Sequence, residues 1–211
     1  GMDMIALTDR NSCKNCRAAV RAGEEAGVTV VPGMELTTSE EAHVVCLFPT
    51  VEQAEAFGDY VESRSPEIRN RPEIFGDQLI MDWQDEGVGR VSRLLINASS
   101  ISVGELPGLM AEFGGAAFPA HIDHDSYSVI SSLGAIPAEA EFHAAEISGK
   151  GDKELLLKRY PELQDMILLL DSDAHYLDWL KERRPWLDLP EKTARCLVDA
   201  LNGKIQVKWE R

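Results

Sequence analysis

Short apolar runs alternate with amphipathic helical stretches along most of this chain, and this alternation constrains the fold more than any other feature. The apolar runs typical of buried parallel strands lie at 4–7, 28–31, 42–48, 116–122, 142–147 and 166–170. Periodicity and capping signals favour helices at about 12–27, 50–63, 102–114, 154–159 and 190–202. This order predicts an α/β fold with a parallel sheet, either a closed barrel or an open doubly wound sheet.

The 211 residues are predicted to form one domain, 1–211, with an insertion at about 64–102. Within the insertion, two apolar pieces flank Asp85-Glu86-Gly87, a pattern typical of a hairpin. We expect Pro32-Gly33 to break the second strand and Ser12 and Pro190 to open the first and last helices. The alternating tail at 205–209 favours an edge strand.

The formal net charge is −15, from 36 acidic and 21 basic residues. Such a surface repels a phosphate backbone, so we expect no non-specific nucleic-acid binding. A small phosphorylated substrate stays compatible with this charge, because a metal ion in a cleft would reverse the local field. No apolar run approaches the roughly 20 residues of a membrane span, and no secretory signal is visible. We therefore expect no membrane partner and a cytoplasmic location.

Two of the four cysteines, Cys13 and Cys16, form a C-x-x-C pair. A structural zinc site would need a second pair of ligands at similar spacing, and the other cysteines, Cys46 and Cys196, do not form one. The simpler interpretation is that both are small residues at the start of a helix. A redox role is the alternative, since an exposed C-x-x-C can have a lowered thiol pKa.

Carboxylates and imidazoles gather where the predicted strands end, which is where active sites lie in parallel α/β folds. These residues are Asp9, Glu35, His43, His121, His124, Asp173 and His175. Any one histidine alone is as well explained as a satisfied polar side chain in a loop. The whole set favours a metal site, and its mixture of oxygen and nitrogen donors suits zinc, manganese or iron better than calcium.

Four sequence strings resemble, in the same order, those of the PHP (polymerase and histidinol phosphatase) family of metal-dependent phosphoesterases. They are I-A-L-T-D-R-N-S at 5–12, P-G-M-E-L-T-T-S-E-E-A-H-V-V at 32–45, P-A-H-I-D at 119–123 and S-D-A-H at 172–175. The resemblance implies a distorted (β/α)7 barrel, two or three bound metal ions in a complete member, and in many members the hydrolysis of phosphate esters.

The resemblance also implies metal ligands. Glu35 would bridge two ions, and His43 and His121 would join it at one of them. Asp173 would bind the other ion alongside Glu35, and His175 would belong to a third position.

The remaining matched residues would have catalytic or binding roles. Asp9 would hold the first strand end or touch a metal-bound water, and His124 would act on the substrate or support the ligands. His143 matches no family string and is expected to be structural.

Two departures from the family pattern change these expectations. The family's H-x-H strand would lie before Gly1, so we expect a barrel that lacks its first strand and binds one or two ions. The strand edges at 4–7 and 166–170 would then be covered by the tail at 205–209 or by a second subunit, as in a homodimer. The other departure is Arg10, which replaces a histidine and cannot ligate a metal. Arg10 either binds a phosphoryl group in the cleft or pairs with a surface carboxylate.

The sequence therefore predicts a metal-dependent phosphoesterase that hydrolyses a small phosphorylated substrate through a metal-activated water, with activity weakened by the missing H-x-H. The alternative is a degenerate, non-catalytic PHP domain that binds a metal or another ligand.

Overall fold

The computed structural model describes residues 2–180 and 186–209. Its strands are β1 (Met4–Leu7), β2 (Thr29–Thr37), β3 (His43–Leu47), β4 (Leu79–Met81), β5 (Gly87–Arg90), β6 (Ala116–Pro119), β7 (Ala144–Glu146), β8 (Ile167–Leu169), β9 (Leu187–Asp188) and β10 (Lys208–Trp209). Its α-helices are α1 (Cys16–Ala26), α2 (Val51–Ser63), α3 (Pro72–Phe75), α4 (Leu106–Phe113), α5 (Val129–Leu133), α6 (Lys153–Arg159) and α7 (Ala194–Leu201). None of the helices described is both long and apolar enough to cross a bilayer.

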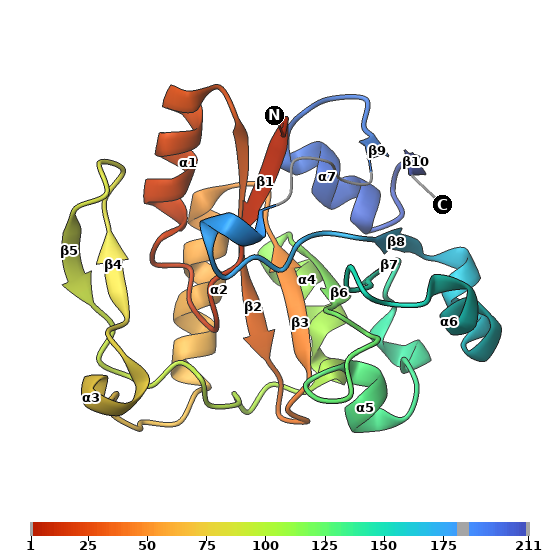
Figure 1. Cartoon of the computed structure of the whole chain (residues 1–211), viewed down its shortest axis with the longest axis horizontal. Helices are drawn as coiled ribbons and strands as arrows, with labels where there is room; N and C mark the ends of the chain where they lie inside the picture. The colour runs from red at the N-terminus through yellow and green to blue at the C-terminus, as the bar shows by residue number, and fades with distance from the viewer. Residues whose placement is uncertain (1, 181–185, 210–211) are drawn as a thin grey trace.

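The central sheet has the strand order β1-β2-β3-β6 (Figure 1). β1 runs parallel to β2, whereas β2 and β3 are antiparallel, and so are β3 and β6. The parallel pair β7–β8 lies beside β6, where the Ile122 amide donates a 2.9 Å hydrogen bond to the Glu146 carbonyl. Because β3 runs opposite to both neighbours, the end of β2, the start of β3 and the end of β6 share one edge of the sheet.

The fold is mixed α/β, and the predicted all-parallel sheet is wrong at β3. A tight turn joins β2 to β3: Glu41 has φ 60°, and its amide donates to the Thr38 carbonyl across 2.9 Å. So short a connection permits a hairpin but not the crossover that parallel neighbours need. Within the described residues the strands form separate sheets, so the barrel implied by the family resemblance is not confirmed.

β2 continues through Pro32-Gly33, where a break was expected. Pro32 is tolerated because its pairing with Leu7 is the last of the β1–β2 ladder, where a missing N–H costs little. Gly33 suits this position because a Cβ there would lie 2.5 Å from the carbonyl oxygen of Cys46 on β3. The uninterrupted strand carries Glu35 into the centre of the sheet.

The helix starts are partly as expected. α2 begins after Thr50, and the Thr50 hydroxyl accepts a backbone N–H of its first turn, as predicted. Ser12 does not cap α1, which begins at Cys16. α7 follows a cap at Thr193 instead of beginning at Pro190.

The tail does not pair with β1 within the described residues, because β10 pairs antiparallel with β9. Of the two covers expected for the edges at 4–7 and 166–170, strand pairing by the tail is therefore not found at 4–7. β1 pairs with β2 on one side, and Ile5 keeps 38% of its surface exposed. Cover by a second subunit stays a prediction.

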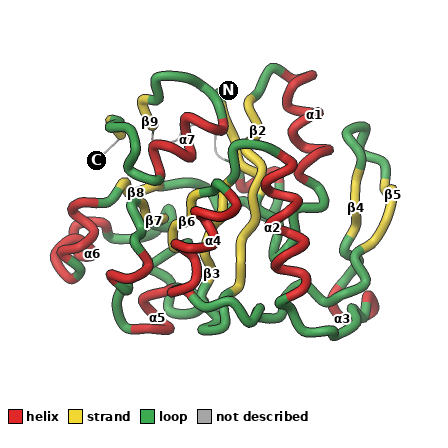
Figure 2. The backbone as a smooth tube through the Cα atoms, turned by 180° about the vertical axis from the view of Figure 1, so that it is seen from behind, coloured by secondary structure: helices red, strands yellow, loops and turns green. Residues whose placement is uncertain are grey.

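The main core lies between the sheet and the helices α2 and α4. Figure 2 views the molecule from behind, and there these helices lie in front of the sheet. Its largest fully buried side chains include Phe48, Phe57, Met34 and Leu36. The alternate residues of β3, Val45 and Leu47, face a second core beneath α7. In both views the β4–β5 hairpin and α6 lie at opposite ends of the molecule.

Asn11 joins the end of the β1 segment to distant parts of the chain. Its Nδ2 donates to the carbonyls of Leu95 (2.8 Å) and Asn97 (2.9 Å), and its Oδ1 accepts the Thr37 amide (2.8 Å). Asn11 has φ 50°, a left-handed conformation that asparagine tolerates better than most residues. This side chain therefore connects β2 to the segment that follows the β4–β5 hairpin.

Candidate metal centre

Three side chains converge at the edge shared by β2, β3 and β6. Glu35 is paired with Val45 across the β2–β3 ladder, so both face away from the core under α2. His43 is the first residue of β3 and points to the same face as Val45. His121 follows β6 by two residues. The sheet thus brings His121 next to His43 and Glu35, which precede it in the chain by 78 and 86 positions.

The three ligand atoms have the spacing of a metal site. Glu35 Oε1 lies 3.0 Å from His43 Nδ1 and 3.3 Å from His121 Nε2, and the two nitrogens are 3.2 Å apart. All three residues are buried. Ligands at bond lengths of about 2.1 Å are separated by about 3.0 to 3.4 Å in octahedral or tetrahedral geometry. The triangle is therefore the size of one face of a coordination sphere, and its donors suit a divalent ion.

The protonation states also favour metal binding. Burial alone would raise the pKa of Glu35, but hydrogen bonds from His121 and His43 and the charge of Arg10 outweigh it and hold that pKa far below its usual value. Burial lowers the pKa of His43, despite the opposing effect of Glu35. An anionic carboxylate beside a neutral imidazole is the state that a cation requires.

Arg10 turns inward onto this group. Its guanidinium contacts Glu35 Oε2 through Nε (3.1 Å) and Nη2 (2.9 Å), and its Nη1 lies 2.6 Å from His43 Nε2. Because arginine only donates, this contact makes Nε2 the acceptor and puts the proton of neutral His43 on Nδ1. The carboxylate that pairs with Arg10 is thus the buried Glu35 and not one on the surface, and binding of a phosphoryl group by Arg10 stays a prediction.

A residue that sequence reasoning missed supports His121. His121 has the left-handed φ of 29°, and its amide donates to Glu146 Oε1 across 3.1 Å. Glu146 is only 5% exposed, and burial and the charge of Asp171 raise its pKa well above the usual value. The available signal was an acidic residue inside an apolar run, at the end of a predicted strand.

Aromatic contacts surround the two histidines. Tyr127, also missed, stacks on His43 with ring centroids 5.0 Å apart, and its carbonyl accepts the His43 amide (2.8 Å). His124 stacks on His121 at 4.5 Å. His121 Nδ1 is buried and has no hydrogen-bond partner among the described residues.

The other candidates lie outside the triangle. Asp173 and His175 are exposed, and His175 Nδ1 lies 3.0 Å from the Asp173 carbonyl oxygen, so they contact each other. The Asp9 carboxylate accepts a 2.9 Å hydrogen bond from Asn15, and burial raises its pKa. His143 is exposed, beside Gly203.

No protein-family model matches the chain, and no curated protein matches it. Solved structures do match. Endonuclease Q from Pyrococcus furiosus, a lesion-specific endonuclease, superposes with a TM-score of 0.65 at 15% identity, over 99% of this chain and 50% of that one. Endonuclease Q in complex with a 27-mer duplex that has an abasic lesion at the active site gives a TM-score of 0.65 at 14% identity, with the same coverage.

A protein from Bifidobacterium adolescentis, provisionally described as a metal-dependent phosphoesterase, matches with a TM-score of 0.56 at 17% identity, over 83% of this chain and 78% of that one. The chain spans half the length of the Endonuclease Q structures. At these identities the matches establish a shared fold, and this fold agrees with the family resemblance in the sequence.

The matches also correct one expectation. A small phosphorylated substrate was expected from the family resemblance and an absence of non-specific nucleic-acid binding from the net charge, and both are contradicted because Endonuclease Q holds duplex DNA on a related fold. The error lies in the physical argument, since a net charge summed over the chain does not give the field inside a site.

Proposed function

We propose that this chain is a metal-dependent phosphoesterase of the PHP type that cleaves a phosphodiester in nucleic acid. The observation that carries this proposal is the buried triangle of Glu35, His43 and His121, whose spacing and protonation suit a divalent ion. The structural matches to Endonuclease Q and to the Bifidobacterium protein support the reaction class and the substrate class.

Glu35, His43 and His121 would hold the ion, for which zinc, manganese and iron are the candidates by donor type. Such an ion neutralises phosphoryl oxygens and lowers the pKa of a bound water. Glu146 fixes the backbone of His121 through its 3.1 Å hydrogen bond, so the imidazole is aimed before any ligand arrives. We propose Asp173 and His175 as ligands of a further ion.

Arg10 would bind a phosphoryl oxygen. When His43 uses Nδ1 as a ligand atom, its proton resides on Nε2, which then no longer accepts from Arg10. The guanidinium thereby loses an acceptor, and its planar donors match the oxygens of a phosphate. Asp9, half-buried and next to Arg10 in the chain, and His124, stacked on His121, are the proposed groups for proton transfer and substrate contact.

The test is cleavage of a duplex oligonucleotide with one abasic site, compared with an undamaged duplex and with a generic phosphodiester. We expect cleavage that requires added Mn²⁺ or Zn²⁺, stops with chelator and is lost in Glu35→Gln. Glu55→Gln is the matched control, because Glu55 forms an ion pair with Arg17 on the surface. Metal binding without cleavage of any substrate would favour the non-catalytic alternative, and equal rates in Glu35→Gln would refute the proposal.

A further inference from the structure

The thiols of Cys13 and Cys16 share one acceptor. Both Sγ atoms lie 3.3 Å from the Gly33 carbonyl oxygen, within hydrogen-bonding distance, and the single S–H of Cys13 can turn to Cys16 Sγ instead of that oxygen. Cys13 is 2% exposed and Cys16 is 1% exposed. The spacing of a C-x-x-C at the first turn of a helix thus places two sulfur atoms side by side against β2.

The surroundings make the two thiols unequal. Cys16 is the first residue of α1, an 11-residue helix whose N-terminal amides favour a negative charge. The hydrogen bond from Cys13 lowers the pKa of Cys16, and the same bond together with burial raises the pKa of Cys13. Cys16 is therefore suited to accept the proton that Cys13 must lose before it reacts.

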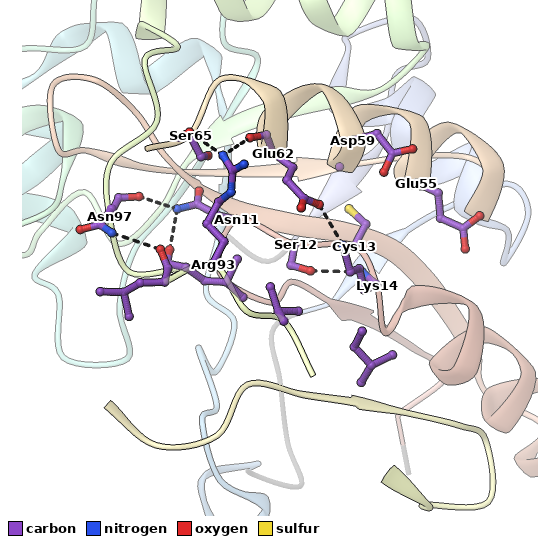
Figure 3. Close-up of a pocket in the computed structure, with 15 residues that line it drawn as sticks. Asn11, Ser12, Cys13, Lys14, Glu55, Asp59, Glu62, Ser65, Arg93 and Asn97 are labelled. Carbon is purple, nitrogen blue, oxygen red and sulfur yellow. Dashed lines mark hydrogen bonds and ion pairs between the residues drawn. The ribbon is translucent and has the colours of Figure 1, made fainter. Parts of the chain in front are cut away.

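A cavity reaches Cys13, and Cys16 is not among the residues that line it. Its volume is about 380 Å³, and Cys13 lies in its wall beside Ser12, Lys14 and Gly58 (Figure 3). A Cβ at Gly58 would stand 3.2 Å from the Cys13 Cβ, so the glycine keeps α2 clear of the thiol. The cavity is within the size range of small-molecule sites. A small disulfide can therefore approach from this side.

We propose that Cys13 and Cys16 are a redox modification site that closes into a reversible disulfide by exchange with a low-molecular-weight disulfide. Cys13, in the cavity wall, passes its proton to Cys16, attacks one sulfur of that reagent and expels a thiolate, forming a mixed disulfide. The deprotonated Cys16 sulfur then attacks Cys13 Sγ and expels the second thiolate. Two protein thiols are oxidised, the reagent is reduced to two thiols, and the two protons pass to the leaving groups.

Oxidation also affects the strand of the candidate metal centre. The disulfide has no S–H groups, so the Gly33 carbonyl loses its thiol donors. Gly33 lies two residues before Glu35 on β2. We expect the oxidised chain to bind Mn²⁺ about tenfold more weakly than the reduced chain, as when a group that orients a ligand is lost. This part rests on the proposed metal role, whereas formation of the disulfide does not.

The test uses the full chain equilibrated with mixtures of reduced and oxidised glutathione, quenched with iodoacetamide, digested with trypsin and analysed by mass spectrometry. Trypsin cleaves after Lys14, between the two cysteines, so a Cys13–Cys16 disulfide holds two short peptides together. We expect linked peptides that disappear on reduction, and a persistent glutathione adduct on Cys13 in Cys16→Ser. Cys196→Ser is the control and should change nothing, because Cys196 lies on α7.

Separately alkylated Cys13 and Cys16 after equilibration with excess oxidised glutathione, in protein shown to be folded by circular dichroism, would overturn the disulfide. Equal Mn²⁺ affinities for the oxidised and reduced chains would overturn the link to the metal centre. If the reduced chain bound no Mn²⁺ at all, the metal role would fail while the linked peptides still established the disulfide.

Discussion

Two regions of this protein contain the carboxylate and imidazole pairs typical of metal sites, and they differ in how the fold holds them. Glu35 and His43 lie in paired strands, are buried, and meet His121 from a third strand. Asp173 and His175 follow β8, whose described partner is β7, and their side chains are 39% and 54% exposed. A short sequence string therefore suggests metal ligands equally well in both regions. Only in the first region do neighbouring strands on both sides bring those ligands together.

The same contrast holds for the backbone. His121 and Asp173 both have left-handed φ values, 29° and 42°. At His121 the buried Glu146 carboxyl accepts the strained residue's amide, whereas at Asp173 the contact is with its own neighbour His175. Strain at a site persists where surrounding structure enforces it. The region of Glu35, His43 and His121 is therefore preorganised for a ligand. The region of Asp173 and His175 needs further contacts before it is preorganised.

The largest expected effect on metal affinity comes from removing a ligand in the first region. Replacing His43 or His121 by Gln removes one nitrogen of the triangle, and we expect Mn²⁺ affinity to fall at least about 100-fold, since even groups that only orient ligands are worth 10- to 100-fold. Isothermal titration calorimetry measures this. His143→Gln is the matched control, because His143 is exposed and outside the group. Unchanged affinity in either variant would show that the triangle is not the metal site.

A smaller effect tests the support of His121. Glu146→Ala leaves the His121 amide without its acceptor, so we expect unfolding free energy to fall by about 1–3 kcal/mol and Mn²⁺ affinity by about tenfold. Glu146→Gln keeps an oxygen acceptor and resembles the neutral carboxyl that the raised pKa indicates. Urea denaturation and metal titration compare the two variants. The same loss in both would mean that the hydrogen bond to His121 is not what Glu146 contributes.

The smallest expected effect on metal affinity comes from substitutions in the second region. Asp173→Asn and His175→Ala lie outside the triangle, so we expect each to change Mn²⁺ affinity at Glu35, His43 and His121 by no more than about twofold. Competition with a chelating dye resolves a difference of that size. A loss beyond about tenfold would show that the two regions join in one site once an ion is bound.

Local patterns predicted the local structure well. The alternation of strands and helices, the cap at Thr50 and the apolar runs that became β2 and β3 all depend on neighbours in sequence. The antiparallel β3 could have been inferred, because the connection at 38–42 is too short for a crossover. Pro32 misled because a proline at the end of a ladder and a proline that breaks a strand look alike in sequence.

The candidate site shows where sequence reasoning stops. Glu35, His43 and His121 were noticed because carboxylates and imidazoles gather at the predicted strand ends and match the family strings. Glu146 was missed because its role depends on β7 lying beside β6. This packing brings its carboxyl to the His121 amide, although the two residues are 25 positions apart in the chain. Arg10 was noticed as a departure, but its two contacts with Glu35 and His43 depend on side-chain direction that no string encodes.

The side chain of Asn11 has a consequence for synthesis of the protein on the ribosome. Its partners Leu95 and Asn97 lie 84 and 86 residues further along the chain. At translation rates of about 5–20 residues per second, those partners emerge several seconds after Asn11 does. The turn that carries Arg10 is therefore completed late, after the β2–β3 hairpin has been made. Vectorial synthesis thus delivers the ligand-bearing hairpin before the partners that complete the turn at Asn11.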